Sequence, residues 1–254
     1  MEESKTKEES KKSIKKPLIV FIIFTLLSIA FTFVVKKINV RPVVTVPEIC
    51  ENCEVSSEEG HPSVGLADIN EKVRGAFSYG DSGINDFWYK ISKYSGYAIF
   101  LPLAFFVILG FVQLVNRKSL KKVDNEIKFL ALFYIAVGIV YILFEKFLII
   151  NYRPVMLDGA IESSYPSSHT LFAITICGSA MLLTRRLLKL KHAILINIVL
   201  ALLMIITVVG RLLSGVHWPT DIIGGILIGV ALVAAFATVI NIKPAKELAK
   251  EKTK

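Results

Sequence analysis

Cysteine is scarce in this sequence, which contains only three among its 254 residues. Cys50 and Cys53 form a C-x2-C pair, but a metal site would need two further ligands and only His61 is near. A redox centre with this spacing usually lies in a thioredoxin-like βαβ context, which the sequence lacks. We therefore interpret the pair as structural or incidental, with a local disulfide as an open alternative. Cys177 lies in an apolar run and is expected to be a packing residue.

Charged residues are also few, at 20% of the chain, whereas 54% of the residues are hydrophobic. The mean hydropathy of +0.59 is too high for a typical soluble domain of this size. A membrane-spanning helix needs about 20 apolar residues, with a range of about 17–25. The sequence therefore predicts an all-α fold, a six-transmembrane helical bundle, with spans at about 17–35, 98–115, 128–148, 170–184, 194–213 and 221–241.

The first apolar run lacks the small residues that would mark the cleavage site of a signal peptide. Lys36 and Lys37 follow it instead, and the run is long for the apolar region of such a peptide. We interpret it as a retained anchor. The expected organisation is a disordered basic head at 1–16, a six-span domain at 17–241 and a basic tail at 242–254.

Positive charge is not gathered into one region, although the net charge is +9. Most Lys and Arg lie in four short segments, 1–16, 116–128, 185–192 and 241–254. With six spans these segments fall on one side of the membrane, the positive-inside pattern, which places both termini in the cytoplasm. Attraction to anionic lipid is sufficient to explain the charge, so no nucleic-acid partner is expected. The loop 36–97 then faces outward, and we expect one or two short interfacial helices in it.

Three short stretches with basic and histidine residues lie at the ends of apolar runs on the predicted outer side. Ionisable side chains cost about 2.5–3.5 kcal/mol each at the centre of a span, so those kept beside spans are expected to have a function. In the first stretch, Lys146 and Arg153 are seven residues apart and would share one face of a helix that Pro154 ends. Taken alone, the pair is also explained by two cations that reach the membrane interface.

The second stretch, Pro166-Ser167-Ser168-His169, precedes the fourth apolar run, whose helix is expected to begin within it. Serine before a helix supplies capping oxygens, and the free amides of a first helical turn bind anions. Taken alone, an ordinary capped helix start with an interfacial histidine explains this stretch at least as well.

The third stretch runs from Arg211 through His217 to Asp221. Pro219 suits the first turn of a helix, so Asp221 is expected one turn beyond His217, where it can accept a hydrogen bond from the ring. A carboxylate on one ring nitrogen selects the tautomer and leaves the other nitrogen free to attack. The alternative is an ordinary acidic residue at a helix N-terminus.

Together, the three stretches resemble the type 2 phosphatidic acid phosphatase superfamily, which also includes the vanadium haloperoxidases. Its signature is Lys-x6-Arg-Pro, then Pro-Ser-Gly-His, then Ser-Arg-x5-His-x3-Asp. The same order and internal spacing occur here at Lys146–Pro154, Pro166–His169 and Gly210–Asp221. The resemblance covers roughly residues 85–240. It departs from the signature at two positions, because Ser168 replaces the usual Gly and Gly210 replaces the usual Ser.

The resemblance implies a role for each matching residue. His217 would attack phosphorus and form a phosphohistidine, Asp221 would orient His217, and His169 would protonate the leaving group and then help to activate water. The phosphoryl oxygens would be held by the remaining matches, which are Lys146, Arg153, Ser167, Ser168 and Arg211. Because these cations would take the part that Mg²⁺ plays in kinases, neither a metal nor another cofactor is expected.

The activity that the resemblance implies is hydrolysis of a lipid phosphate or diphosphate at the outer leaflet of the cell membrane. Phosphatidic acid, phosphatidylglycerol phosphate and undecaprenyl diphosphate are the candidate substrates. A phosphotransferase that passes the phosphoryl group from lipid to an acceptor other than water stays an alternative. A transporter or scaffold is less favoured because no motif charge is missing. Haloperoxidase chemistry belongs to soluble members, and six spans argue against it.

Overall fold

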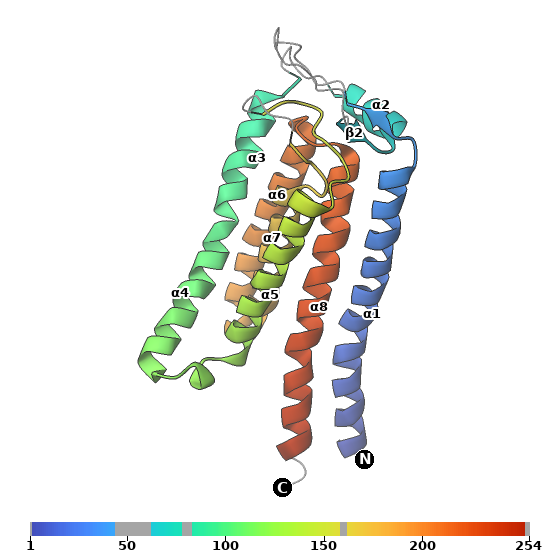
Figure 1. Ribbon diagram of the computed structural model, residues 1–254. Coiled ribbons are helices and arrows are strands. Elements are labelled where there is room, and N and C mark those ends of the chain that lie inside the picture. Colours follow the sequence, from blue (N-terminus) through green and yellow to red (C-terminus); the bar gives the residue numbers. More distant parts are fainter. Residues whose placement is uncertain (1, 44–61, 78–82, 158–161, 252–254) are drawn as a thin grey trace.

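The computed structural model describes residues 2–43, 62–77, 83–157 and 162–251, which form a bundle of long helices (Figure 1). The helices are α1 (Glu2–Lys37), α2 (Ala67–Gly75), α3 (Asp86–Ala98), α4 (Phe100–Arg117), α5 (Asn125–Ile142), α6 (Ser168–Leu187), α7 (Leu190–Leu213) and α8 (Pro219–Glu251). A 3-10 turn at Leu120–Lys122 precedes α5, and a π-helical turn at Leu143–Phe147 follows it. The short strands β1 (Arg41–Pro42) and β2 (Ser63–Val64) pair antiparallel.

Six helical segments of the described chain are long and apolar enough to cross a membrane. They are Ser13–Lys37, Asp86–Arg117, Asn125–Phe147, Ser168–Leu187, Leu190–Leu213 and Pro219–Asn241. The prediction of an all-α, six-span bundle is therefore confirmed. Local apolar runs are sufficient to predict these spans, because in hydrocarbon a helix satisfies its own backbone groups internally.

The start of α1 and the end of α8 lie at the same end of the bundle. The two helices pack side by side, and both chain ends lie at the bottom of Figure 1, whereas α2, β2 and the start of α3 lie at the top. We call this top end the outer end, after the predicted topology. Which end faces the cytoplasm stays a prediction from the charge pattern.

The second span begins at Asp86, not near residue 98 as the apolar pattern predicts. α3 continues into α4 through Ile99, whose backbone is helical, with φ −62° and ψ −20°. Among the described residues of the outer loop, only α2 is therefore a separate short helix. The physical reason is that α3 packs against α7, where Ser92 is fully buried. A Cβ on Gly210 of α7 would lie 2.9 Å from the Cβ of Ser92, so the two helices are in close contact.

Helix extends further than expected at both ends of the chain. α1 begins at Glu2, so the head 1–16, which the sequence predicts to be disordered, is helical from residue 2. Glu and Lys, which are frequent in this head, are good helix formers. α8 likewise continues to Glu251, through most of the predicted tail. Cys50 and Cys53 lie outside the described residues.

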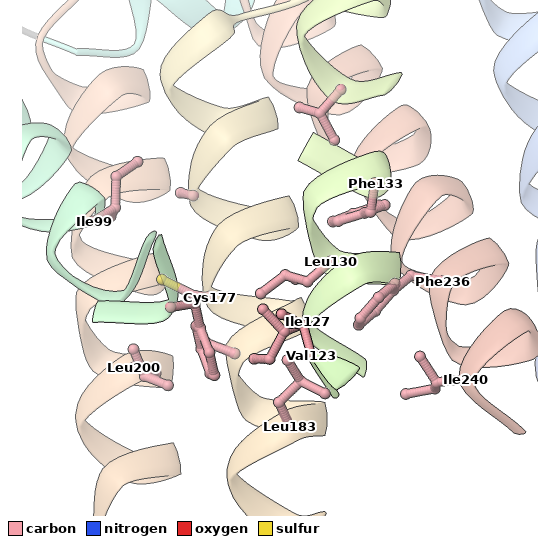
Figure 2. Close-up of a cluster of buried hydrophobic side chains, with 14 residues drawn as sticks. Ile99, Val123, Ile127, Leu130, Phe133, Cys177, Leu183, Leu200, Phe236 and Ile240 are labelled. Carbon is pink, nitrogen blue, oxygen red and sulfur yellow. The ribbon is translucent and has the colours of Figure 1, made fainter. Parts of the chain in front are cut away.

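The main hydrophobic core surrounds α6, which packs against α4, α5, α7 and α8. Figure 2 shows this cluster, in which the rings of Phe133 and Phe236 stack with centroids 4.9 Å apart. Cys177 is fully buried there, as predicted for a packing residue. α6 and α8 approach so closely that a Cβ on Gly229 would lie 2.9 Å from Cγ2 of Ile174. Close contact of this kind holds helices together in lipid, where burial of apolar surface provides little driving force.

Candidate active site

Residues from all three sequence stretches meet at the outer end of the bundle, between the start of α6, the end of α7 and the start of α8. The described parts of the connection between the turn after α5 and α6, residues 148–157 and 162–167, lie at this end (Figure 1). Ser167, Arg211, His217 and Asp221 are each at most 4% exposed. Buried charged and polar groups are costly without partners, so the contacts among these side chains indicate what the site is built to hold.

His217 and Asp221 lie together because α8 begins between them. Pro219 is the first residue of α8, and Oδ2 of Asp221 accepts a hydrogen bond from the backbone N–H of Trp218 at 3.0 Å. An acidic side chain that reaches back over the first turn in this way caps the helix. The same Oδ2 lies 3.5 Å from Nδ1 of His217, and Nδ1 has no hydrogen-bond partner among the described residues. The structure thus brings the carboxylate to the ring, as the spacing predicts.

The other ring nitrogen of His217 faces a cation. Nη1 of Arg153 lies 3.0 Å from Nε2 of His217. A guanidinium can only donate, so Nε2 accepts and the ring proton is on Nδ1, toward Asp221. Burial, together with the charges of Arg153 and Arg211, holds the pKa of His217 well below its usual 6.5. The ring is therefore neutral, with a lone pair on Nε2 directed at the cation.

Arg153 reaches this position from a loop, not from a helix. The helical segment ends at Phe147, so the prediction that Lys146 and Arg153 share a helix face is wrong. The backbone N–H of Arg153 donates to the carbonyl of Glu162 at 3.0 Å, and its Nε lies 3.0 Å from the Glu162 carboxylate. An isolated bridge between Tyr152 and Ser163 continues this pairing. The pairing of the two loop arms, and not helical periodicity, carries Arg153 over His217.

His169 and Arg211 form a second contact within the same cluster. Nη2 of Arg211 is hydrogen-bonded to Nε2 of His169, which lies in the first turn of α6. The Arg211 guanidinium also lies over the ring of Tyr89, with Cζ 5.7 Å from the centroid. Its Nε is buried and has no hydrogen-bond partner within the described chain. The ring of His169 packs against Gly96 of α3, where a Cβ would lie 2.6 Å from Cδ2.

The start of α6 is tied to the start of α8. The backbone N–H of Ser167 donates to the carbonyl of Asp221 at 3.0 Å. Ser167 is the residue before the helix, but its side chain makes no capping bond; its hydroxyl accepts instead from Thr170 at 3.2 Å. Ser168 is half-buried and its backbone is helical, so the change from Gly introduces no strained conformation. The first-turn amides of α6 are thus not covered by a capping oxygen, which suits anion binding.

Lys146 is the one predicted phosphate-binding residue that the structure does not bring to the cluster. It is exposed in the π-helical turn, and its side chain makes no hydrogen bond or ion pair with any described residue. Its role stays a prediction. Gly210, the other departure from the signature, packs against Ser92 of α3. A Ser side chain at this position would therefore be directed against α3.

Sequence reasoning missed several residues that contact the predicted ones, and three of them touch charged groups of the cluster. Tyr89 stacks on Arg211, Glu162 pairs with Arg153, and Nδ2 of Asn151 donates to Oδ1 of Asp221 at 2.8 Å. Of these three, only Asn151 could have been suspected from the sequence, because it is an amide side chain directly after an apolar run. The other two gave no signal, because aromatic residues at a membrane surface and acidic residues in loops are common.

The cluster combines the neutral imidazole of His217 with two guanidinium groups and a second imidazole. The two guanidinium groups point to an anion with several oxygens, because planar donors bind carboxylate or phosphate well. Among the described residues, no three His, Cys, Asp or Glu side chains are grouped closely enough to ligate one metal ion. The arrangement is therefore able to hold a phosphoryl group against Nε2 of His217.

Comparison with known proteins gives one family and one solved structure. The model of the PAP2 superfamily matches residues 17–244. The fold is similar to the crystal structure of the first transmembrane PAP2 type phosphatidylglycerolphosphate phosphatase from Bacillus subtilis, with a TM-score of 0.52 and 17% sequence identity. That alignment covers 93% of this chain and 96% of the other chain. A comparison with curated proteins finds no match.

Proposed function

The chain belongs to the PAP2 superfamily, and we propose that it is a membrane lipid phosphatase acting through a phosphohistidine intermediate. The observation that carries this proposal is the convergence of Arg153 on Nε2 of His217, with Asp221 on Nδ1 of the same ring. This geometry presents a neutral imidazole lone pair to the place where Arg153 would hold a phosphoryl oxygen. His169 and Arg211 supply a second proton carrier and a second cation at the same site.

In the first step, Nε2 of His217 attacks phosphorus while the bond from phosphorus to the lipid oxygen breaks. Arg153 and Arg211 hold the phosphoryl oxygens, whose charge is spread in the transition state. His169, which enters this step as the imidazolium, gives a proton to the departing lipid oxygen and becomes neutral. His217 gains a bond at Nε2 while keeping its proton on Nδ1, so Asp221 stabilises the positive charge that develops on the ring.

In the second step, water attacks the phosphohistidine and the nitrogen–phosphorus bond breaks. His169 takes a proton from that water, phosphate leaves, and Nε2 regains its lone pair. A phosphotransferase differs only here, since an acceptor hydroxyl would take the place of water. Measuring free phosphate and phosphorylated acceptor in the same reaction separates these two activities.

The proposed substrate is a lipid monophosphate or diphosphate at the outer leaflet, with its headgroup at the outer end of the bundle. Phosphatidic acid, phosphatidylglycerol phosphate and undecaprenyl diphosphate are the three candidates. The structurally similar Bacillus subtilis protein is titled a phosphatidylglycerolphosphate phosphatase, which favours including that lipid. The reaction as written uses no metal ion.

The test is phosphate release by the purified protein in detergent from these three lipids, with and without EDTA. His217→Ala is expected to abolish release and to prevent labelling of the protein by ³²P-phosphate from substrate. His192→Ala is the matched control, because His192 is an exposed histidine at the other end of α7. Full activity of the His217 variant would contradict the mechanism. Loss of activity in EDTA would contradict metal independence.

A further inference from the structure

A closed ring of buried hydrogen bonds lies directly behind Asp221. Its members come from four places in the chain: Gly65 after β2, Asn70 in α2, Asn151 after the π-helical turn, and Thr220 in the first turn of α8. The three polar side chains are at most 2% exposed. Gly65 is wedged against the end of α1, because a Cβ there would lie 1.5 Å from the carbonyl oxygen of Val35. The ring therefore joins the outer segment to the start of α8.

Every amide group of the two asparagines is used in this ring. Oδ1 of Asn151 accepts from the N–H of Gly65 at 3.0 Å, and its Nδ2 donates to Oγ1 of Thr220 at 3.1 Å. Nδ2 of Asn70 donates to the carbonyl of Gly65 at 2.8 Å and to the same Oγ1 at 2.9 Å. Oδ1 of Asn70 accepts from the N–H of Thr220 at 3.2 Å.

Of the N–H donors of the two asparagine amides, one remains outside the ring, and it is directed at Asp221. Because Oδ1 of Asn151 receives a backbone N–H, the orientation of its amide is determined and Nδ2 must face Thr220 and Asp221. Nδ2 lies 2.8 Å from Oδ1 of Asp221. The two carboxylate oxygens thus have separate partners: Asn151 takes Oδ1, and Oδ2 remains for His217 and the N–H of Trp218.

We propose that Asn151 is a positioning residue of the reaction, which holds Asp221 in the rotation that directs Oδ2 at the His217 ring. The ring through Asn70 and Thr220 keeps the Asn151 amide in place, so the outer segment contributes to the active site without reaching it. This inference rests on the proposed phosphatase function, because it acts through the same His217. Hydrogen bonds to charged groups in such positions are strong, so loss of this one is expected to lower kcat roughly ten- to hundredfold.

The test compares Asn151→Ala with Asn151→Asp in detergent, using the same three lipids. In N151A the donor is absent at every pH, so the fall in kcat is expected to be independent of pH. In N151D a carboxyl replaces the amide beside Asp221, and like charges at this distance favour one shared proton. The protonated acid donates as the amide did, so N151D is expected to regain most of the wild-type kcat at low pH and to lose it as pH rises. The charged and titratable groups facing this pair are His217, Arg153 and Tyr165.

A merely structural role for Asn151 predicts a different pattern. N151A and N151D would then lose activity and thermal stability together, with no recovery of kcat at low pH, and that result would overturn the proposal. Asn70→Ala is the control within the ring, since it weakens the same ring without touching Asp221. It is expected to lower the melting temperature while keeping more of the kcat than N151A. If N151A does not purify, the pH profile of N151D decides.

The two proposals fail in distinguishable ways. If the protein is not a phosphatase of this mechanism, the wild type releases no phosphate or His217→Ala remains active. If only the role of Asn151 is wrong, the wild type is active and His217→Ala is inactive, while N151A keeps more than half of the wild-type kcat or N151D shows no pH-dependent recovery.

Discussion

Gly96 is expected to set the position of the His169 ring, and this can be tested by adding one methyl group. In Gly96→Ala the new Cβ would lie 2.6 Å from Cδ2 and 3.2 Å from Nε2 of His169. Carbon atoms pack at about 3.5–4.0 Å, so the ring would have to retreat by about 1 Å. α3 is not free to move away instead, because Ser92 contacts Gly210 and the Thr207 hydroxyl donates to Ser95 at 2.9 Å.

The expected result is a large loss of kcat with modest destabilisation. A misplacement of about 1 Å in a catalytic group costs on the order of a hundredfold in rate. Overpacking of this size costs about 1–3 kcal/mol of stability, which leaves the folded protein in excess. The displaced ring would also lose its hydrogen bond from Arg211. The assay is phosphate release in detergent, with a thermal melt of the same preparation.

Gly138→Ala is the matched control, because a Cβ at this position in α5 meets nothing within 4 Å. Alanine is a better helix former than glycine by about 0.5–1 kcal/mol, so this variant is expected to be at least as stable as the wild type and equally active. Wild-type kcat in Gly96→Ala would refute the reasoning, since the His169 ring would then not depend on the gap at Gly96. Equal losses in both variants would also refute it.

Two further predictions concern charge. Because Lys146 is exposed and outside the cluster, Lys146→Ala is expected to raise KM for the lipid phosphate less than Arg211→Ala does; an equal or larger rise would place Lys146 at the substrate. Burial with nearby guanidinium groups holds the pKa of His217 well below 6.5, so its ring stays neutral in mild acid. If His217 is the nucleophile, as proposed, the fall of kcat/KM that its protonation causes is expected below pH 6.5. In the unfolded chain His217 binds a proton near pH 6.5, whereas in the folded chain it does not, so the free energy of unfolding decreases as pH drops below about 6.5. The melting temperature is therefore expected to decrease less over this pH range for His217→Gln than for the wild type.

The fold was largely predictable because membrane spans are local features. A run of apolar residues of sufficient length forms a helix in lipid without help from the rest of the chain. The error in the second span arose where this rule does not apply. Ser92, Ser95 and Gly96 are not apolar enough to extend the run, but they face α7, where small residues allow close packing.

The candidate site was predictable where its partners are close in sequence. His217 and Asp221 are four residues apart across a helix start, so their spacing alone brings them together. The prediction that Lys146 and Arg153 share a helix face was wrong. Residues seven apart lie on one face only if both are in the same helix, and the helical segment ends at Phe147. Glu162 was not found because its contact with Arg153 depends on how a loop folds back on itself.

The sequence by itself determined the membrane class, the six spans, and the residue types of the three stretches at the ends of those spans. Only the tertiary structure decided which of these residues meet. Arg153 contacts His217, which is 64 residues away in the sequence. Arg211 and His169, which are in contact, are 42 residues apart, and Asn151 and Asp221 are 70 residues apart. Contacts at such separations depend on how closely the helices pack and on where each helix begins. These are set by small residues such as Gly96 and Gly210, whose partners lie on other helices and leave no periodic signal in the chain.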